Sequence, residues 1–337
     1  MVDDLGITHH GRTETVNRAL TDFGIEDSFG QASKRFKEHY GFRLSESTVD
    51  RVTKASALQA EAYLEQKLRE GKDRQGQTPE SNGLSEELLI ELDGCEIRTG
   101  IYVPAENGPG DEQSKRTKVI RWRDVRVGLA RPMTSKSKLY VAQMEKYPEV
   151  VSQLVCVAAM LGMAEETDVV GVADGGKGLR EELENQFPNM QFILDKSHLK
   201  KHLYETSAAL GFNEKQQHQW VHSRLDEISK GHVQDILEDL ETQNATEPNE
   251  RLRQFIGYLT RFRDAVDYDH FKELGYPIGS GEVESSHKSI PQKRLKLPGA
   301  CWHPDSINPM LYLRIIRAND WWEDYWACRI AGIKEAA

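Results

Sequence analysis

The sequence lacks the features that mark membrane proteins, secreted proteins and disulfide-stabilised domains. No apolar run approaches the roughly 18 residues that a membrane-spanning helix needs. The first residues, MVDDLGITHHGR, are polar and acidic and contain no secretory signal. The four cysteines form no CxxC pair and are too scattered for a zinc site or a disulfide framework; they are Cys95, Cys156, Cys301 and Cys328. We therefore expect a cytoplasmic, globular protein with reduced and mostly buried cysteines.

Positive charge is also in short supply. The 337 residues include 44 Lys and Arg against 54 Asp and Glu, a net charge of −10. This total weakens a hypothesis of nucleic-acid binding, because phosphate contact needs cations. The charge is unevenly distributed, however, and two stretches are basic. The C-terminal basic segment (288–296) holds Lys288, Lys293, Arg294 and Lys296, and the central basic segment (115–126) holds Arg116, Lys118, Arg121 and Arg123. A local cationic surface therefore remains possible.

Residues 13–70 have the apolar spacing of three helices. In the first, Val16, Ala19, Leu20 and Phe23 recur at helical intervals and Gly24 is placed to end the helix. A second helix contains Phe29, Ala32 and Phe36 and stops at Gly41, and a third begins near Ser47, where Ser47 and Asp50 resemble a capping box. This pattern fits a helix-turn-helix with Arg51 and Lys54 as candidate DNA contacts, and it equally fits an ordinary helical bundle.

After a polar, Gly- and Pro-containing linker at 71–86, the pattern changes to strands. Strand-like segments at 88–93, 96–103 and 118–129 are followed by a helix near 150–161, a strand at 168–173, a helix from Leu179 and a strand at 192–194. This order predicts an α/β fold with a mixed five-stranded sheet and helices packed on it. Residues 197–271 contain no strand signal, and Met310–Trp326 is helical and aromatic.

Asp93 closes the apolar run LLIELD and precedes Gly94. An Asp-Gly pair between two strands is a strong signal for a hairpin turn. A hairpin would still leave the Asp93 carboxylate at the end of a strand, so the turn and a metal-ligand role are compatible.

Asp174 ends the run VVGVAD, which has the composition of a parallel strand buried on both faces. Ligands of open α/β sheets bind beyond the carboxyl ends of such strands. The glycines that follow in GGKG let a backbone approach closely. A phosphate-binding loop is the alternative, but GGKG does not fit GxxxxGK[ST], since Gly178 follows Lys177.

Glu284 lies in GSGEVESSHK, in the first turn of a helix that Ser280 or Gly281 could cap. An acid in this position is also explained by its favourable interaction with the helix dipole, and Glu282 satisfies that explanation equally well. Together, Asp93, Asp174 and a glutamate of this helix could converge on one face. Carboxylate oxygens of this kind bind Mg²⁺, and a pair of such ions can promote attack on a phosphodiester.

Three blocks of the sequence resemble the insertion-sequence DDE transposases, in particular the ISKra-type group related to the Mutator-like superfamily. The blocks are ELDG, VADGGKGLREELENQFPNMQFILDKSHLKKHL and YPIGSGEVESSHK, within a similarity that covers about residues 10–320. The resemblance implies an RNase H-like catalytic fold with a helical insertion, preceded by a helix-turn-helix-like region. The implied boundaries are a helical region at 1–70, a linker at 71–86, the core at 87–210, the insertion at 211–275 and the last part of the core with C-terminal helices at 276–337.

The resemblance also implies the site. Asp93, Asp174 and Glu284 would be the catalytic acids and ligands of Mg²⁺ or Mn²⁺, since the family's glutamate stands in a GSGxxES context. Asp195 and His198 match a recurrent aspartate-x-x-histidine block and would support the site, with Asp195 as the rival to Asp174 for the second acid. The expected DNA contacts are Lys288, Lys293, Arg294, Lys296 and Trp302, the last by stacking on an unpaired base or else as a core residue.

The implied activity is cleavage and strand transfer of DNA at the ends of an insertion sequence, by a dimer or larger assembly associated with the nucleoid. Members of the group often carry a further DNA-recognition segment upstream, which we do not expect this sequence to contain. Two alternatives therefore stay open. One is a truncated or domesticated DNA-binding protein without catalysis, and the other is an RNase H-like nuclease that cuts without joining.

Overall fold

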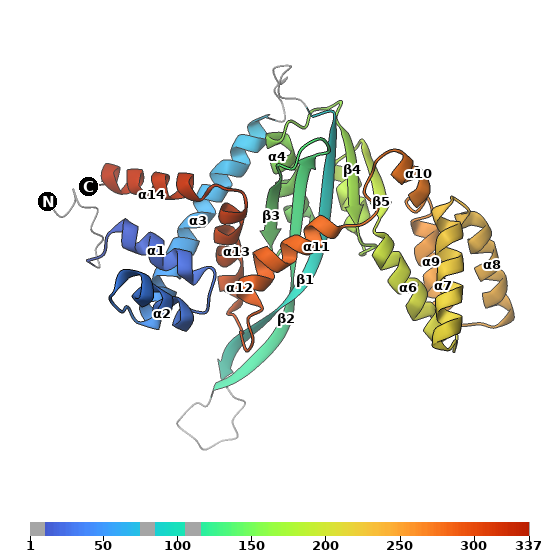
Figure 1. The fold of residues 1–337 in the computed structure, drawn as a ribbon, viewed down its shortest axis with the longest axis horizontal. Coiled ribbons are helices and arrows are strands. Elements are labelled where there is room, and N and C mark those ends of the chain that lie inside the picture. Colours follow the sequence, from blue (N-terminus) through green and yellow to red (C-terminus); the bar gives the residue numbers. More distant parts are fainter. Residues whose placement is uncertain (1–10, 75–84, 105–115, 337) are drawn as a thin grey trace.

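A five-stranded mixed sheet forms the centre of the molecule. The computed structural model describes residues 11–74, 85–104 and 116–336. The sheet has the order β3-β2-β1-β4-β5 (Figure 1). Its strands are β1 (Glu87–Pro104), β2 (Arg116–Pro132), β3 (Leu139–Gln143), β4 (Asp168–Ala173) and β5 (Met190–Leu194). The first three strands pair antiparallel, and β1–β4 and β4–β5 pair parallel. This confirms the predicted mixed five-stranded sheet.

The long strand β1 corrects two of the predicted strands. Segments 88–93 and 96–103 are one continuous strand, in which Asp93 pairs with Val127 and Gly94 with Arg126. The predicted turn at Asp93-Gly94 does not form, because β2 is long enough to pair along the whole of β1. The third antiparallel strand is instead β3, a segment of five residues at the sheet edge that was not predicted.

The two faces of the sheet bury different residues of β1. Leu88, Ile90 and Leu92 belong to a core shared with α4 (Tyr147–Met160) and α5 (Leu179–Gln186). Side chains of a strand alternate between faces, so Glu91 and Asp93 point to the opposite side. That side is covered by α11 (Gly281–His287) and α13 (Ile307–Ala318), which contact β1, β2 and β3.

The N-terminal region forms the three predicted helices, α1 (Glu14–Gly24), α2 (Phe29–Tyr40) and α3 (Glu46–Arg74). Leu20, Phe36 and Val49 are central to their small shared core. The cap predicted at Ser47 is wrong, because Ser45 Oγ accepts the Thr48 N–H at 3.2 Å. The linker predicted from residue 71 also begins too early, since α3 continues to Arg74; residues 75–84 lie outside the described residues.

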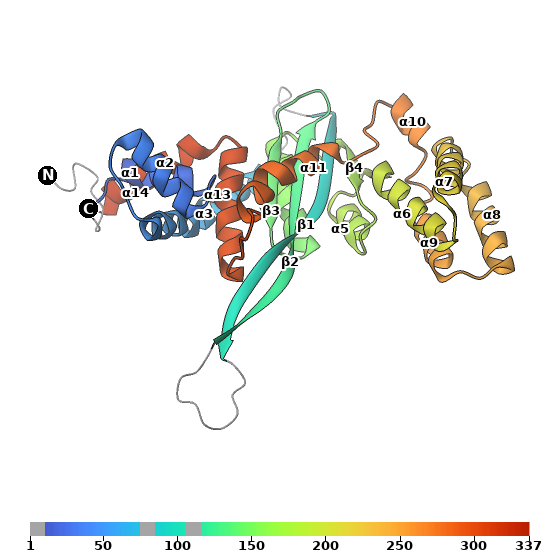
Figure 2. The ribbon, with the colours of Figure 1, turned by 60° about the horizontal axis from the view of Figure 1, so that its bottom comes forward.

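Residues after β5 are helical, as predicted. The helices α6 (Lys196–Ala209), α7 (Glu214–Ser229), α8 (Val233–Thr246), α9 (Glu250–Arg261) and α10 (Tyr268–Glu273) lie at the end of the molecule opposite the N-terminal helices (Figures 1 and 2). The chain then returns to the sheet through α11, a π-helical turn (Lys288–Gln292), α12 (Lys293–Leu295) and a 3₁₀ turn (Pro304–Ser306). The predicted helix 310–326 is two helices, α13 and α14 (Trp322–Ala336), separated at Asp320 with φ of 60°.

None of the helices within the described ranges is long and apolar enough to span a membrane. All four cysteines are free, as predicted. The expectation that most are buried is wrong, since Cys156 is buried whereas Cys95 and Cys301 are half-buried and Cys328 is exposed.

Candidate active site

Asp93 and Asp174 lie side by side on neighbouring strands. The last parallel pair between β1 and β4 is Leu92 with Ala173, and the two aspartates are the next residue on each strand. Neighbouring strands are roughly 5 Å apart. The sequence predicted that Asp93 ends its strand, but β1 continues beyond it. Asp93 instead marks the point where β1 stops pairing with β4. The parallel register therefore brings together two acids that are 81 positions apart in the sequence.

The Asp93 carboxylate is held by two neighbours. Oδ1 accepts the Gly94 N–H at 2.7 Å, and Oδ2 lies 3.3 Å from Nε2 of His287 on α11. Burial disfavours protonation of His287, but its interactions with Asp93 and Cys95 outweigh burial and raise the pKa to about 9. Burial likewise opposes ionisation of Asp93, yet His287 and the Gly94 N–H lower its pKa overall. Asp93 is thus an ionised carboxylate beside a buried imidazolium.

The Asp174 carboxylate has fewer protein contacts than that of Asp93. Oδ1 accepts the Gly176 N–H at 2.9 Å, and the side chain is half-buried. The glycine loop after it passes directly under the ring of Tyr258, because a Cβ at Gly175 would lie 2.3 Å from a ring carbon. Arg261 fixes the same loop by donating to the Gly175 carbonyl at 2.7 Å. Gly175 therefore serves close packing against α9.

Asp195 is fully engaged by protein donors. It is 1% exposed and caps α6, accepting the His198 N–H at 2.9 Å on Oδ1. Its other oxygen accepts the N–H and the hydroxyl of Ser280 at 2.6 and 2.7 Å. Although burial opposes ionisation, His198 and Ser280 hold the pKa of Asp195 far below its usual range. Asp195 thus joins α6 to the residue before α11.

His198 connects this clamp to the two aspartates. Hydrogen bonding to Asp195 raises its pKa, burial acts in the opposite direction, and the charges of Asp174 and Asp93 add to the increase. His198 is therefore close enough to both site aspartates to sense their charge. The structure brings Asp93, Asp174, Asp195 and His198 into one neighbourhood.

The two glutamates of α11 have different environments. Glu282 forms ion pairs with Arg131 Nε at 2.8 Å and Lys138 Nζ at 3.0 Å, which hold it on the β2 side of the helix. Two helical positions differ by about 200° around the axis, so Glu284 projects from the side of the helix opposite Glu282. Glu284 is exposed. Glu282 is thus paired with two cations, whereas Glu284 forms no ion pair with a described residue.

Three contacts fix the orientation of α11. Two have been described, between Ser280 and Asp195 and between His287 and Asp93. In the third, Oε2 of Glu91 accepts the Val283 N–H at 2.7 Å. Glu91 is 1% exposed, and burial raises its pKa to about 8. Neither Glu91 nor His287 was identified from the sequence. A charged residue at a core-like position of LLIELD was the available signal for Glu91, and the spacing of three residues from Glu284 was the signal for His287.

The donor chemistry of the site suits Mg²⁺ or Mn²⁺. Asp93 and Asp174 present hard carboxylate oxygens at the same place in the sheet, and Mg²⁺ is commonly held by one or two carboxylates with water and phosphate as other ligands. Within the part of the chain that the structure describes, no three His, Cys, Asp or Glu side chains are close enough to hold a metal ion together. The two aspartates therefore fit the ion as its protein ligands, whereas Glu284 is an exposed residue of α11.

The C-terminal basic segment is only partly available to a ligand. Lys288 and Lys296 are exposed, and Lys293 pairs with Glu26. Arg294 is buried, contrary to its expected role as a DNA contact, and Trp302 is buried in agreement with the alternative prediction of a core residue. The Arg294 guanidinium donates to the Gly24 carbonyl at 2.7 Å and lies between the rings of Phe29 and Trp302, at 4.5 and 4.6 Å from their centroids. This cation attaches the N-terminal helices to the core.

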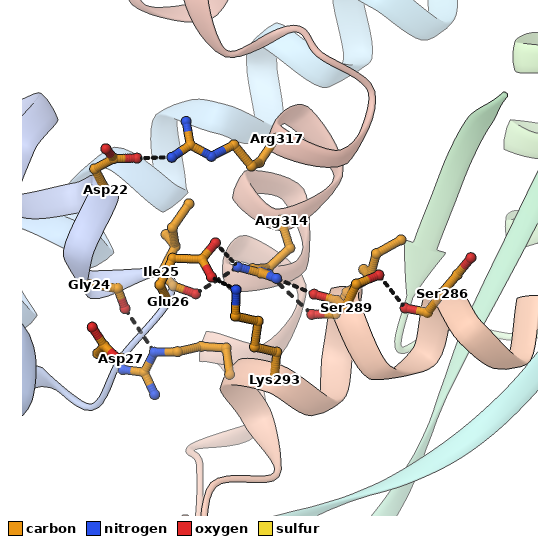
Figure 3. Close-up of polar contacts among 12 residues, drawn as sticks. Asp22, Gly24, Ile25, Glu26, Asp27, Ser286, Ser289, Lys293, Arg314 and Arg317 are labelled. Atoms are coloured by element: carbon orange, nitrogen blue, oxygen red, sulfur yellow. Dashed lines mark hydrogen bonds and ion pairs between the residues drawn. The ribbon is translucent and has the colours of Figure 1, made fainter. Parts of the chain in front are cut away.

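Arg314 of α13 makes a second buried attachment at the π-helical turn (Figure 3). It donates to the Ile290 carbonyl at 3.2 Å and to the Ser289 carbonyl, on the turn that contains Pro291. It also donates to the Ile25 carbonyl at 3.0 Å and to Glu26, both just after α1. Arg314 thereby ties this turn to the N-terminal helices.

The chain has a weak structural likeness to a known protein, without detectable sequence relatives. No protein-family model matches the sequence. No curated protein matches it either. Among solved structures, the chain is similar to one described as "Drosophila P element transposase strand transfer complex", with 9% sequence identity and a TM-score of 0.43 over 95% of this chain and 96% of that chain. A likeness at this level identifies neither a function nor the site residues.

Proposed function

We propose that this chain is a DNA transposase of the DDE type, which cleaves and joins DNA at the ends of an insertion sequence. The observation that supports this most is the adjacent placement of Asp93 and Asp174 under a helix that presents Glu284. The resemblance of the surrounding sequence blocks to ISKra-type enzymes supports the same reaction.

The environments of the acids support particular roles. We assign the second acid to Asp174, because both oxygens of Asp195 already accept protein hydrogen bonds. We assign the third acid to Glu284, because Glu282 is committed to two ion pairs on the β2 side. Asp195 and His198 are positioning residues that fix α6 relative to α11.

When bound, Mg²⁺ or Mn²⁺ would supply Lewis-acid activation of the attacking oxygen and neutralise charge at the phosphodiester. The chain itself contributes positioning. Asp93 and Asp174, at the end of β4, would hold the ion, Glu284 on α11 is the third acid, and the exposed Lys288 and Lys296 neutralise neighbouring phosphates. Water first attacks at the element's end and frees a 3′-hydroxyl, which then attacks target DNA. Because two ends must be held together, a dimer or larger assembly is expected.

The decisive experiment compares strand cleavage and joining by wild type, Glu284→Gln and Glu282→Gln. The substrate is a short duplex carrying the element's own ends, with Mg²⁺ or Mn²⁺. We expect Glu284→Gln to abolish both steps, with duplex binding retained. Glu282→Gln is a matched control from the same helix and should remain active. Normal strand transfer by Glu284→Gln would disprove the assignment.

One observation favours a second candidate function. The contact between Asp93 and His287 occupies part of an expected metal ligand, which suits a DNA-binding relative that has lost catalysis. Specific duplex binding without cleavage by any variant would support that alternative. Cleavage without joined products would instead indicate a nuclease.

A further inference from the structure

Beyond the site, β1 and β2 continue as a two-stranded arm. We define the arm as residues 96–103 of β1 and 116–124 of β2, which remain paired from Glu96 with Asp124 to Val103 with Thr117. At its base the arm packs on the core, since the Gly100 N–H donates to the Trp302 carbonyl at 2.8 Å and the Trp302 N–H donates to the Arg98 carbonyl at 3.1 Å. Figures 1 and 2 both show the outer part of the arm projecting away from the helices and the rest of the sheet. The arm is a direct continuation of the strand that carries Asp93.

The arm is cationic in a chain of net negative charge. It holds five cations, Arg98, Arg116, Lys118, Arg121 and Arg123, against two acids, Glu96 and Asp124. Arg121 and Arg123 are exposed, and neither forms an ion pair with any residue that the structure describes. Exposed cations without a protein partner are available to an anionic ligand.

Large apolar side chains are exposed on the same arm. Trp122 is 58% exposed, Tyr102 65% and Ile120 43%. The register sets Trp122 opposite Arg98 and Tyr102 opposite Lys118, so these four share one face, while Arg121 and Arg123 lie on the other. Lys118 Nζ stands 5.7 Å from the Tyr102 ring centroid. Ile101, 39% exposed, lies on the face of Arg121 and Arg123. Both faces therefore carry cations, and the Trp122 face carries the larger exposed apolar side chains.

We propose that this arm binds duplex DNA next to the reacting phosphodiester. This inference rests on the proposed function and assigns the duplex contact to a particular surface. The major groove, about 12 Å wide, admits a two-stranded β-ribbon, and cations on both faces of such a ribbon reach the phosphates of both groove walls. Arg98 lies five positions after Asp93, roughly 17 Å at the rise of an extended strand. A duplex held at the site therefore meets the arm within one helical turn.

Trp122 provides a direct test. All six tryptophans lie in described residues; Trp122 is exposed, Trp321 is half-buried and the others are buried. Acrylamide quenching of tryptophan fluorescence therefore reports mainly on Trp122. A 30-base-pair duplex should protect wild type from quenching, and Trp122→Phe should remove that protection. Equal protection of Trp122→Phe and wild type would contradict the proposal.

The charge is tested by the double variant Arg121→Ala/Arg123→Ala, with duplex binding followed by fluorescence anisotropy at stepped salt without divalent metal. Each lost phosphate contact should lower the slope of log K against log salt by about one, so the double variant should lower it by about two. The matched control, Lys215→Ala/Arg253→Ala, removes two exposed cations from α7 and α9 and should leave the slope unchanged. An equal decrease in both double variants would overturn the assignment to the arm.

Sedimentation of the same variants tests the competing occupant, a second copy of this chain. Loss of self-association with an unchanged salt slope would make the arm a contact between copies and overturn the proposal. The binding assay contains no metal, so its result does not depend on catalytic activity. Arm-dependent binding without cleavage would contradict the proposed function alone, and cleavage with arm-independent binding would contradict the arm alone.

Discussion

The central and C-terminal basic segments look alike in the sequence and differ in the structure. Both combine several cations with an aromatic residue within or near the segment. In the C-terminal segment Arg294 is 3% exposed and lies between two aromatic rings, whereas in the central segment Arg121 and Arg123 face solvent. A basic run is therefore not in itself a ligand surface.

The difference arises from how each segment packs against the rest of the protein. The chain around α12 passes between the sheet and the N-terminal helices, where the carbonyls of Gly24 and Ile25 need donors. A guanidinium with several N–H groups satisfies such acceptors and packs against aromatic rings. On the arm, Arg121 and Arg123 are exposed and form no ion pair with a described residue, so their charge stays available. Four predictions test this contrast, from the largest expected effect to the smallest.

Arg314→Ala should lower the free energy of unfolding by about 3–5 kcal/mol. The substitution removes the buried cation that pairs with Glu26 and leaves the Ile290 and Ile25 carbonyls without this donor. Urea denaturation measures the change. The control is Arg317→Ala on the same helix, whose ion pair with Asp22 is between side chains 38% and 41% exposed. That variant should cost less than about 1 kcal/mol. Equal losses would show that the buried contacts contribute nothing extra.

Arg294→Ala should cost about 2 kcal/mol, since it deletes one charged hydrogen bond and two stacking contacts. Its neighbour Lys293, with a side chain 54% exposed, is the control and should cost less than about 1 kcal/mol as Lys293→Ala. Thermal or urea unfolding distinguishes the two. A larger loss for Lys293→Ala would reverse our assignment of structural and exposed cations within this segment.

Glu91 extends the comparison to a buried acid. Burial raises its pKa from 4.5 to about 8, so the unfolded chain releases the proton at lower pH than the folded chain. Stability from this residue is therefore present below about pH 4.5 and is lost as the pH rises toward 8. Without metal, Glu91→Gln should therefore reduce the dependence of the melting temperature on pH between these two values. Melting temperatures at three pH values test this, and an unchanged slope in the variant would exclude Glu91 as its source.

The smallest effect is expected in the arm. Arg121→Ala/Arg123→Ala removes two exposed cations without described ion-pair partners and should change the free energy of unfolding by less than about 0.5 kcal/mol. Urea denaturation beside Arg294→Ala provides the direct comparison. A loss as large as that of Arg294→Ala would mean that the arm cations are structural, and the contrast between the segments would fail.

Several levels of the structure followed from local sequence. The three N-terminal helices, the buried run of β4 and the strand-free stretch after β5 were predicted because their apolar spacing reports burial directly. The turn at Asp93-Gly94 was predicted wrongly for a related reason. Turn propensity is local, whereas the extended conformation there depends on pairing with Arg126 and Val127 more than 30 positions away.

The sequence by itself determined the types of chemical group at the site and the class of the sheet, since both depend on residue identity and periodicity. The tertiary structure decided which groups meet. The parallel register placed Asp93 beside Asp174, the helical rotation separated Glu282 from Glu284, and packing buried Arg294 while leaving Arg121 exposed. Such outcomes depend on contacts between segments distant along the chain, and residue spacing along the sequence carries no record of those contacts.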